Sequence, residues 1–168
     1  IIFWLICLMP PALVSGPLLA DSFVIIVDIL VLIKIFEKKK FDLFKNRFFI
    51  FFIIFYLILI ASSLFSENIY YSLRSSIPYI RHGIFVLAVI YIIKQDSKFL
   101  KTFYYILFGT FSLLVIDGFI QYLTGTNIFG IHHPHPDRIT SLFGDELKLG
   151  SFLSRLLPLL IGLIIFFG

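Results

Sequence analysis

Ionisable side chains stand inside apolar segments on both sides of a polar loop, in the region from Asp117 to Arg155. Asp117 and Gln121 share one face of a predicted helix before the loop, and Arg155 follows the loop. A charged side chain at bilayer depth costs roughly 2.5–3.5 kcal/mol on insertion scales, so it is usually functional or paired. These residues are therefore the first candidates for a site.

Arginines suggest what chemistry this region performs. A guanidinium presents a planar fork of donors that binds phosphate oxygens bidentately and stays charged when partly desolvated. Four of them fall on one predicted side of the chain: Arg74, Arg81, Arg138 and Arg155. Asp117 is expected roughly 9 Å below the end of its helix, at a depth similar to Arg81 and Arg155. We therefore expect a basic cavity for a lipid-linked phosphate or diphosphate.

Structural alternatives exist for the same residues. Arg81 with Asp117 would also suit an ion pair that only fixes helix packing, and Arg74 and Arg138 would also suit contact with lipid headgroups. Asp145 and Glu146 precede an apolar segment, where acidic residues stabilise the first turn of a helix. Asp145 could instead position an acceptor.

Three histidines lie in the loop, as His132, His133 and His135. Their spacing could suit a metal, but Pro134 and Pro136 force an extended path that separates the side chains. We therefore expect no bound metal, and no other cofactor. A histidine acting as general base would lack a nucleophile beside it.

Composition places these residues in a membrane protein. Hydrophobic residues make up 60% of the chain, charged residues only 14%, and the mean hydropathy is +1.03. Soluble domains are about half apolar and about a quarter charged. The net charge of +4 does not indicate a nucleic-acid partner, because the lysines gather in short loops between apolar segments. No nucleotide-binding or metalloprotease motif occurs, and the single cysteine, Cys7, excludes a disulfide within the chain.

Six apolar segments approach the length of about 20 residues that a spanning helix needs. We predict an all-α fold, a polytopic transmembrane helix bundle forming one domain over residues 1–168, with spans at about 1–16, 18–36, 48–66, 77–93, 102–123 and 149–168. Prolines 10, 11 and 17 interrupt the start of the chain, so the first pair of spans can also be a re-entrant hairpin. Because the chain begins without Met and stops inside an apolar run, we expect it to be the truncated N-terminal part of a longer protein.

Lysines orient the predicted spans. The links EKKKFDLFKNR and KQDSKFLK, after the second and fourth spans, are rich in lysine, and the positive-inside rule places both in the cytoplasm. The N-terminus then lies in the cytoplasm. The bend at Gly16 and Pro17, the segment 67–76 (ENIYYSLRSS) and the loop 124–148 lie outside.

Several sequence runs occur in a familiar order. PPALVSGPLL comes first, YSLRSSIPYIRHGIFVLAVIYII follows with Arg74 and Arg81, and IDGFIQYLTGTNIFG and RITSLFGDELKLGSFLSRLLPLL come last. The last run places Arg138, Phe143-Gly144, Asp145-Glu146 and Leu149-Gly150 in sequence. In this order the runs resemble the opening hairpin, the fourth span and the middle of the O-antigen ligase/polymerase family of bacterial envelope glycosyltransferases. The chain departs from many relatives in having Asp-Glu where they have Asn-Pro.

The resemblance implies a metal-independent glycosyltransferase of the bacterial inner membrane, in lipopolysaccharide or other polysaccharide biosynthesis. It would transfer or polymerise an undecaprenyl-diphosphate-linked glycan at the periplasmic face, with an acceptor glycan or lipid A core as second substrate and membrane lipids around it. Arg81, Arg138 and Arg155 would contact the diphosphate or acidic sugars, and Asp117 would orient an arginine or the acceptor. Asp117 and Arg155 are then the catalytic candidates, and Arg74, Arg81, Arg138, Asp145 and Gln121 the substrate-binding candidates.

The family's established catalytic positions lie in a large periplasmic loop expected beyond residue 168, so they are not carried onto this chain. We expect this part alone to be inactive. The competing hypothesis is a non-enzymatic transporter or flippase of an anionic lipid or glycan, which a repeat in the complete sequence would favour.

Overall fold

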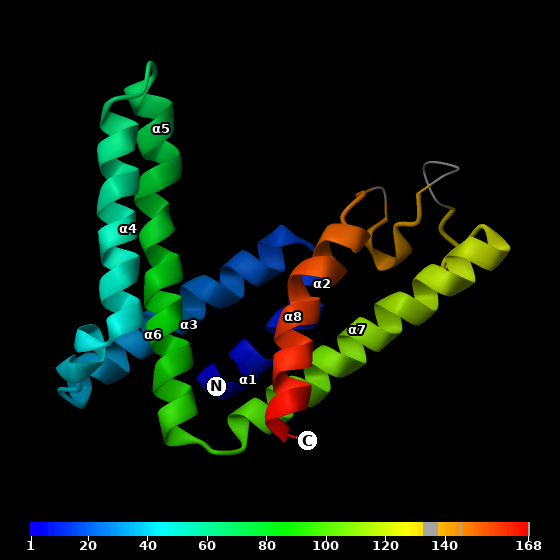
Figure 1. Cartoon of the computed structure of the whole chain (residues 1–168), viewed down its shortest axis with the longest axis horizontal. Coiled ribbons are helices and arrows are strands. Elements are labelled where there is room, and N and C mark those ends of the chain that lie inside the picture. The colour runs from blue at the N-terminus through cyan, green and yellow to red at the C-terminus, as the bar shows by residue number, and fades with distance from the viewer. Residues whose placement is uncertain (133–137, 145, 168) are drawn as a thin grey trace. The chain divides into compact units, whose positions relative to one another are not determined.

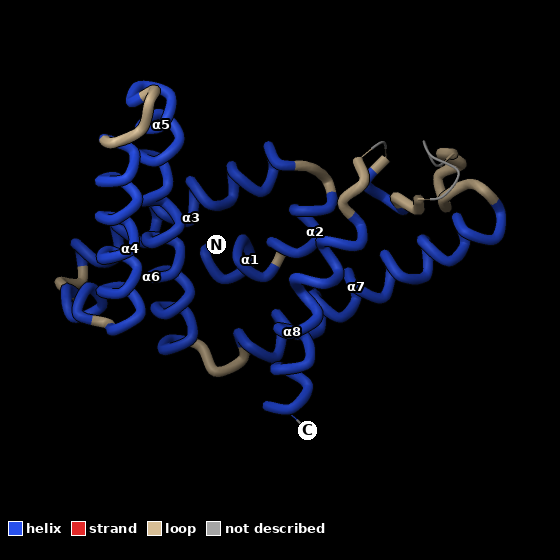
Figure 2. Tube along the Cα trace, turned by 45° about the horizontal axis from the view of Figure 1, so that its top comes forward, coloured by secondary structure: helices blue, strands red, loops and turns tan. Residues whose placement is uncertain are grey.

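Helices make up almost all regular structure of the protein (Figure 2). The computed structural model describes residues 1–132, 138–144 and 146–167. Within these ranges no strand occurs, apart from an isolated bridge between Thr126 and His132. The predicted all-α class is confirmed. The chain divides into two compact units, residues 1–6 with 21–96, and residues 7–20 with 97–168.

The first unit is built on long apolar helices (Figure 1). Its elements are α1 (Ile2–Cys7), most of α3 (Pro17–Glu37), η1 (Phe41–Lys45), α4 (Arg47–Leu64), α5 (Ile69–Ser76), η2 (Ile77–Tyr79) and α6 (Ile80–Gln95). The α5, η2 and α6 elements follow one another as one helical run beside α4. Pro78 is tolerated there because it stands in the first turn of η2, where a missing N–H costs little.

Close packing of α4 on α6 depends on a glycine. A Cβ added at Gly83 would overlap the ring of Phe52, so only glycine lets the ring lie against the α6 backbone. Tyr56 of α4 also donates a hydrogen bond of 3.1 Å to the carbonyl of Ile77. These contacts fix α4 against the run from α5 to α6.

The second unit contains α2 (Met9–Val14), the first residues of α3, α7 (Phe99–Thr124), η3 (Ser141–Phe143) and α8 (Leu149–Phe167). Leu107 of α7 packs with Leu160 and Leu163 of α8 in a small apolar core. The α7 helix ends at Gly125, whose φ of 80° is the left-handed conformation that glycine adopts readily. The chain then turns into the loop that precedes α8.

Four helices of the described part are long and apolar enough to cross a membrane: Arg47–Leu64, Ile69–Gln95, Phe99–Thr124 and Leu149–Phe167. In α4, which is described throughout, Ser63 is the one buried side chain. Its apolar residues point outward, with Phe51 69% and Leu57 61% exposed. An exposed apolar surface of this size is unfavourable in water and suits lipid. The four helices therefore indicate a membrane protein.

The first two predicted spans are not confirmed. Residues 1–16 form two helices of 6 residues each, α1 and α2, which are too short to span. The α3 helix has 21 residues and is apolar, but Asp21, Asp28 and Lys34 give it more charged residues than the four candidates carry in their most apolar 18 residues.

One local prediction was wrong. Segment 67–76 was expected to be a loop, but residues 69–76 form α5. Residues 67–76 contain neither glycine nor proline, and the next proline is Pro78, so nothing breaks the helix before η2. Arg74 therefore lies in the last turn of a helix.

Candidate functional site

A network of buried polar side chains ties the loop after α7 to that helix. Its members are 0–3% exposed and come from both the helix and the loop: Asp117, Gln121, Asn127, Thr140 and Ser141. Buried polar groups are costly unless they are hydrogen-bonded. Each member of this network has such a partner, so residues 127–131 and 140–141 are tied to α7 and to each other.

Asp117 uses both of its carboxylate oxygens within the network. Its Oδ1 accepts a hydrogen bond of 2.8 Å from the N–H of Ile128, and its Oδ2 accepts one from the hydroxyl of Ser141. Hydrogen bonds to an ionised carboxylate are roughly twice as strong as neutral ones. In this structure Asp117 positions the loop, and its expected catalytic role stays a prediction.

Gln121, which lies one turn after Asp117 on α7, forms hydrogen bonds with the backbone of the loop. Its Oε1 accepts from the N–H groups of Thr140, at 2.9 Å, and Ser141, at 2.7 Å, and its Nε2 donates to the Thr140 hydroxyl at 3.4 Å. Ser141 has a φ of 53°, a left-handed conformation that costs about 1–2 kcal/mol for a residue with a Cβ. The bonds from Gln121 and Asp117 stabilise that conformation. The expected contact of Gln121 with substrate stays a prediction.

Asn127, just after the end of α7, forms hydrogen bonds with the loop backbone near it and with that of Ser141. Its side-chain amide donates to the carbonyl of Ser141 at 3.1 Å, and its Oδ1 accepts from the N–H groups of Phe129 and Ile131. Sequence reasoning did not single out Asn127, Thr140 or Ser141. The available signal was polar residues between apolar ones, which does not show that they would be buried.

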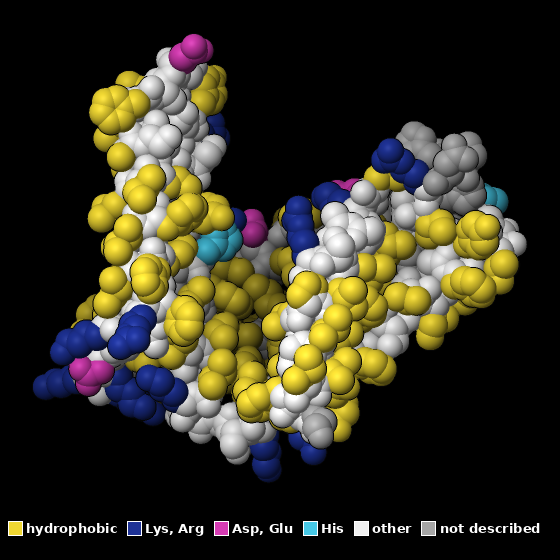
Figure 3. Space-filling model, viewed as in Figure 1, with side chains coloured by type: hydrophobic (Ala, Val, Ile, Leu, Met, Phe, Trp, Pro, Cys, Tyr) yellow, Lys and Arg dark blue, Asp and Glu magenta, His cyan; other side chains and the backbone are white. Residues whose placement is uncertain are grey.

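A cavity of about 290 Å³ lies in the second unit beside the start of α8. Its basic lining residues are Lys148 and Arg155, and the remaining lining includes Glu146 and an apolar group of Leu13, Pro17, Phe143, Phe152 and Leu156. Figure 3 shows basic side chains gathered at this end of α8. An apolar wall beside cationic groups suits an amphipathic ligand with an anionic head.

Among the residues that the structure describes, Arg155 has no acidic partner. Lys148 Nζ lies 2.7 Å from Glu146 Oε2, so the charge of Lys148 is already paired. Arg155 is exposed, and no carboxylate among the described residues lies within ion-pair distance of it. Its guanidinium is therefore available for a phosphate.

Arg81 has a partner in the first unit. Its Nη2 lies 3.2 Å from Oδ1 and 3.3 Å from Oδ2 of Asp21 on α3, with the two side chains 33% and 51% exposed. Asp21 was not among the predicted site residues, although it stands inside an apolar segment. The expected meeting of Arg81 with Asp117 and Arg155 stays a prediction.

The remaining candidates that the structure describes lie at the surface. Arg74 on α5 and Arg138 in the loop are both exposed, which suits contact with headgroups as well as with a ligand. His132 is exposed as well. Asp145, His133 and His135 lie outside the described residues.

Comparisons of this chain with protein-family models, with curated proteins and with solved structures give no match. The resemblance to a glycosyltransferase family therefore depends on the sequence runs quoted above. The geometry adds a cavity lined by Arg155, which has no acidic partner among the described residues, and a buried polar network between α7 and the loop that follows it.

Proposed function

We propose that this chain belongs to a multi-pass inner-membrane glycosyltransferase of the O-antigen ligase/polymerase type. It transfers or polymerises an undecaprenyl-diphosphate-linked glycan at the periplasmic face, and its N-terminus lies in the cytoplasm. The observation that carries the proposal is Arg155, an exposed guanidinium with no described acidic partner, beside an apolar cavity. A polyprenyl diphosphate combines the two matching features, an anionic head and an apolar tail.

The proposed role of Arg155 is electrostatic. As the bond between the sugar and the diphosphate breaks, negative charge grows on the departing diphosphate, and a guanidinium already in place stabilises it. The buried network around Asp117 and Gln121 supports this role indirectly, because it holds the loop that leads into α8. Arg74 and Arg138 would extend the basic surface toward the glycan or the acceptor. In the proposed topology, the first two predicted spans, at about 1–16 and 18–36, also cross the membrane.

Binding of a short-chain polyprenyl diphosphate to the detergent-solubilised protein tests the proposal. Replacing Arg155 with Gln removes hydrogen bonds to a charged group, each contributing about 1.5–3 kcal/mol, so affinity is expected to fall at least about tenfold. Arg47→Gln at the start of α4 is the matched control, with the same change of charge at a position outside the cavity. Wild-type affinity in Arg155→Gln, or an equal loss in both variants, would contradict the proposal.

Glycan transfer in cells that express the full-length protein, with the region beyond residue 168 included, gives the second measurement. Arg155→Gln is expected to abolish transfer at unchanged protein abundance, whereas Arg47→Gln retains it. Binding without any transfer by the wild-type chain in such cells would separate diphosphate recognition from catalysis.

A transporter or flippase of an anionic lipid or glycan is the second candidate function. It is supported by Asp28 on α3, which is 6% exposed and whose two carboxylate oxygens have no hydrogen-bond partner among the described residues. Ionisable groups buried in apolar helices often mark proton or ion pathways. Loss of proton-dependent lipid translocation in Asp28→Asn, with glycan transfer absent from the wild type, would favour this candidate. Translocation independent of pH would contradict it.

A further inference from the structure

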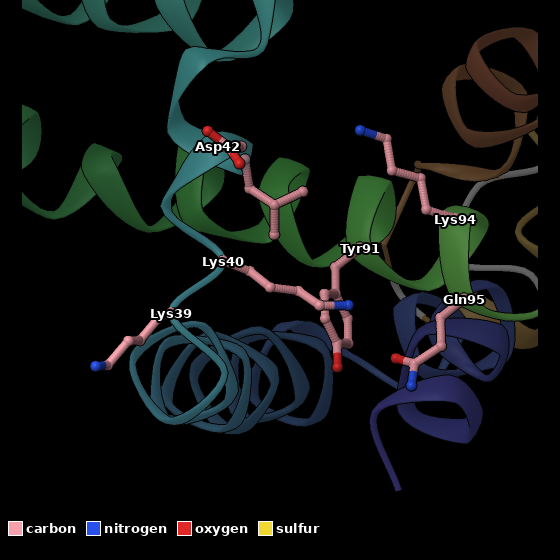
Figure 4. A pocket seen from close by; sticks show the side chains of 7 residues that line it. Lys39, Lys40, Asp42, Tyr91, Lys94 and Gln95 are labelled. Atoms are coloured by element: carbon pink, nitrogen blue, oxygen red, sulfur yellow. The ribbon is translucent and has the colours of Figure 1, made fainter.

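A second, larger cavity of about 560 Å³ lies in the first unit, where the end of α3, η1 and the last turns of α6 meet (Figure 4). The residues that line it come from the loop after α3 and from α6: Lys39, Lys40, Asp42, Leu43, Tyr91, Lys94 and Gln95. Asp42 supplies the one carboxylate that lines the cavity. Its Oδ1 lies 3.5 Å from Nζ of Lys45, which is not one of the lining lysines. The cavity is therefore strongly basic.

The loop that carries two of these lysines has a fixed backbone. The N–H of Lys40 donates to the carbonyl of Ile35 at 3.1 Å, and the N–H of Lys39 donates to that of Phe36 at 3.3 Å. This pair of bonds is a Schellman motif, in which the residue before the last is usually glycine in the left-handed conformation. Here Lys39 occupies that position with a φ of 49°. The helix end thus holds two consecutive lysines at the cavity.

Tyr91 supplies a group that lacks a partner. It is 2% exposed, and its hydroxyl has no hydrogen-bond partner among the described residues. Lys40 Nζ lies 5.3 Å from the centre of the Tyr91 ring, and Figure 4 shows the Lys40 ammonium beside that ring. A buried hydroxyl without a partner is unfavourable, and an oxygen of a ligand would satisfy it. Ammonium and hydroxyl groups are donors of the kind that bind phosphate. Figure 4 shows the Lys39 and Lys94 side chains extending away from Lys40, so these two flexible side chains would turn toward a bound phosphate.

The position of the cavity indicates where that phosphate comes from. The cavity lies where α4 begins and α6 ends, and these are two of the four apolar helices long enough to span a membrane. Phe48 and Phe51, in the first two turns of α4, are 73% and 69% exposed. Figure 3 shows basic side chains gathered at this end of α4. Apolar surface beside a basic cavity accommodates acyl chains as well as a headgroup.

We propose that this cavity binds the phosphate of an anionic phospholipid, in the leaflet that the positive-inside rule assigns to the cytoplasm. Lys39, Lys40 and Lys94 neutralise the phosphate, and the Tyr91 hydroxyl donates to one of its oxygens. The acyl chains lie along the outward apolar face of α4. This site is separate from the diphosphate site proposed above and does not depend on the chemistry assigned there.

Thermal stability of the detergent-solubilised chain, titrated with phosphatidylglycerol, phosphatidylcholine or inorganic phosphate, tests the proposal. Phosphatidylglycerol is expected to raise the melting temperature, and the other two are not. An equal rise with phosphatidylcholine would show that the acyl chains alone act, and an equal rise with inorganic phosphate would show that the site takes a soluble anion. Either result would overturn the lipid assignment.

Matched lysine variants then locate the site. Lys40→Gln is expected to weaken phosphatidylglycerol binding about fivefold, the effect of one lysine near an anionic surface. Lys38→Gln is the control, since Lys38 is exposed in the same loop but does not line the cavity. Equal losses in the two variants would show that the charge acts diffusely, and would overturn the proposal.

Tyr91→Phe gives an independent measurement because the ring stays in place. Removing a buried hydroxyl that has no partner is expected to raise the melting temperature of the lipid-free protein. The same variant is expected to reduce the shift that phosphatidylglycerol produces. An unchanged lipid-induced shift would show that the hydroxyl does not contact the phosphate.

Discussion

Replacing Asp117 with Asn or Ala separates a loop-positioning role from a catalytic one. In Asp117→Asn the amide oxygen can still accept from the N–H of Ile128, while the new NH₂ faces the Ser141 hydroxyl. That hydroxyl can rotate to accept from the NH₂ and donate to the carbonyl of Leu114, which lies 3.3 Å away. Asparagine therefore retains most of the geometry of the network.

The two substitutions differ in magnitude. Asp117→Ala leaves the Ile128 N–H buried without an acceptor, and a lost hydrogen bond to a charged group costs about 1.5–3 kcal/mol. The Ser141 hydroxyl again falls back on Leu114, so its contribution is smaller. We expect a free energy of unfolding lower by about 2–4 kcal/mol for the loop in Asp117→Ala, and by only about 1 kcal/mol in Asp117→Asn.

Hydrogen–deuterium exchange of the segment 125–142 in detergent measures this difference directly. Exchange is expected to rise strongly in Asp117→Ala and slightly in Asp117→Asn. Thr110→Val on the same helix is the control, because its hydroxyl bonds only to the carbonyl of Ile106 within the helix. Loss of glycan transfer by the full-length protein in Asp117→Asn with unchanged exchange would show that positioning is not the only role of Asp117 and would favour direct catalysis. Unchanged exchange in Asp117→Ala would refute the network as the element that holds the loop.

Three further predictions follow from single contacts. Gly83→Ala is expected to destabilise the first unit by about 1–3 kcal/mol in thermal unfolding, because the added methyl overlaps the Phe52 ring. Phe52→Leu in the same protein should restore part of this loss. No restoration would exclude that contact as the cause. Gln121→Met is expected to lower stability by about 2–4 kcal/mol, since two buried loop N–H groups lose their acceptor, and a change below about 1 kcal/mol would show that water replaces it. Asp21→Asn is expected to change the melting temperature little, because its ion pair with Arg81 is half exposed and contributes about 0–1 kcal/mol; a large drop would indicate that the pair is desolvated.

The sequence predicted the general character of the candidate site better than its contacts. Asp117 and Gln121 were singled out because polar residues inside an apolar helix need a reason, and both are buried in the network. The partners Asn127, Thr140 and Ser141 were not, because local sequence does not show which loop residues fold back onto a helix. The ion pair of Arg81 with Asp21, which lies 60 residues earlier in the chain, was not predicted. Side-chain pairing over such distances depends on how helices pack, and residue types alone do not determine it.

Apolarity over about 20 residues is a local property, so the sequence by itself indicated the all-α class and six apolar segments, four of which correspond to long helices that suit a membrane. It also determined which ends of these helices are basic. Tertiary structure decided everything that depends on two segments meeting: the network between α7 and its loop, the apolar cavity beside Arg155, and the lysine cavity at the end of α6. The physical reason is that hydrophobicity acts on each segment alone, whereas a hydrogen bond or ion pair needs two partners brought within about 3 Å of each other.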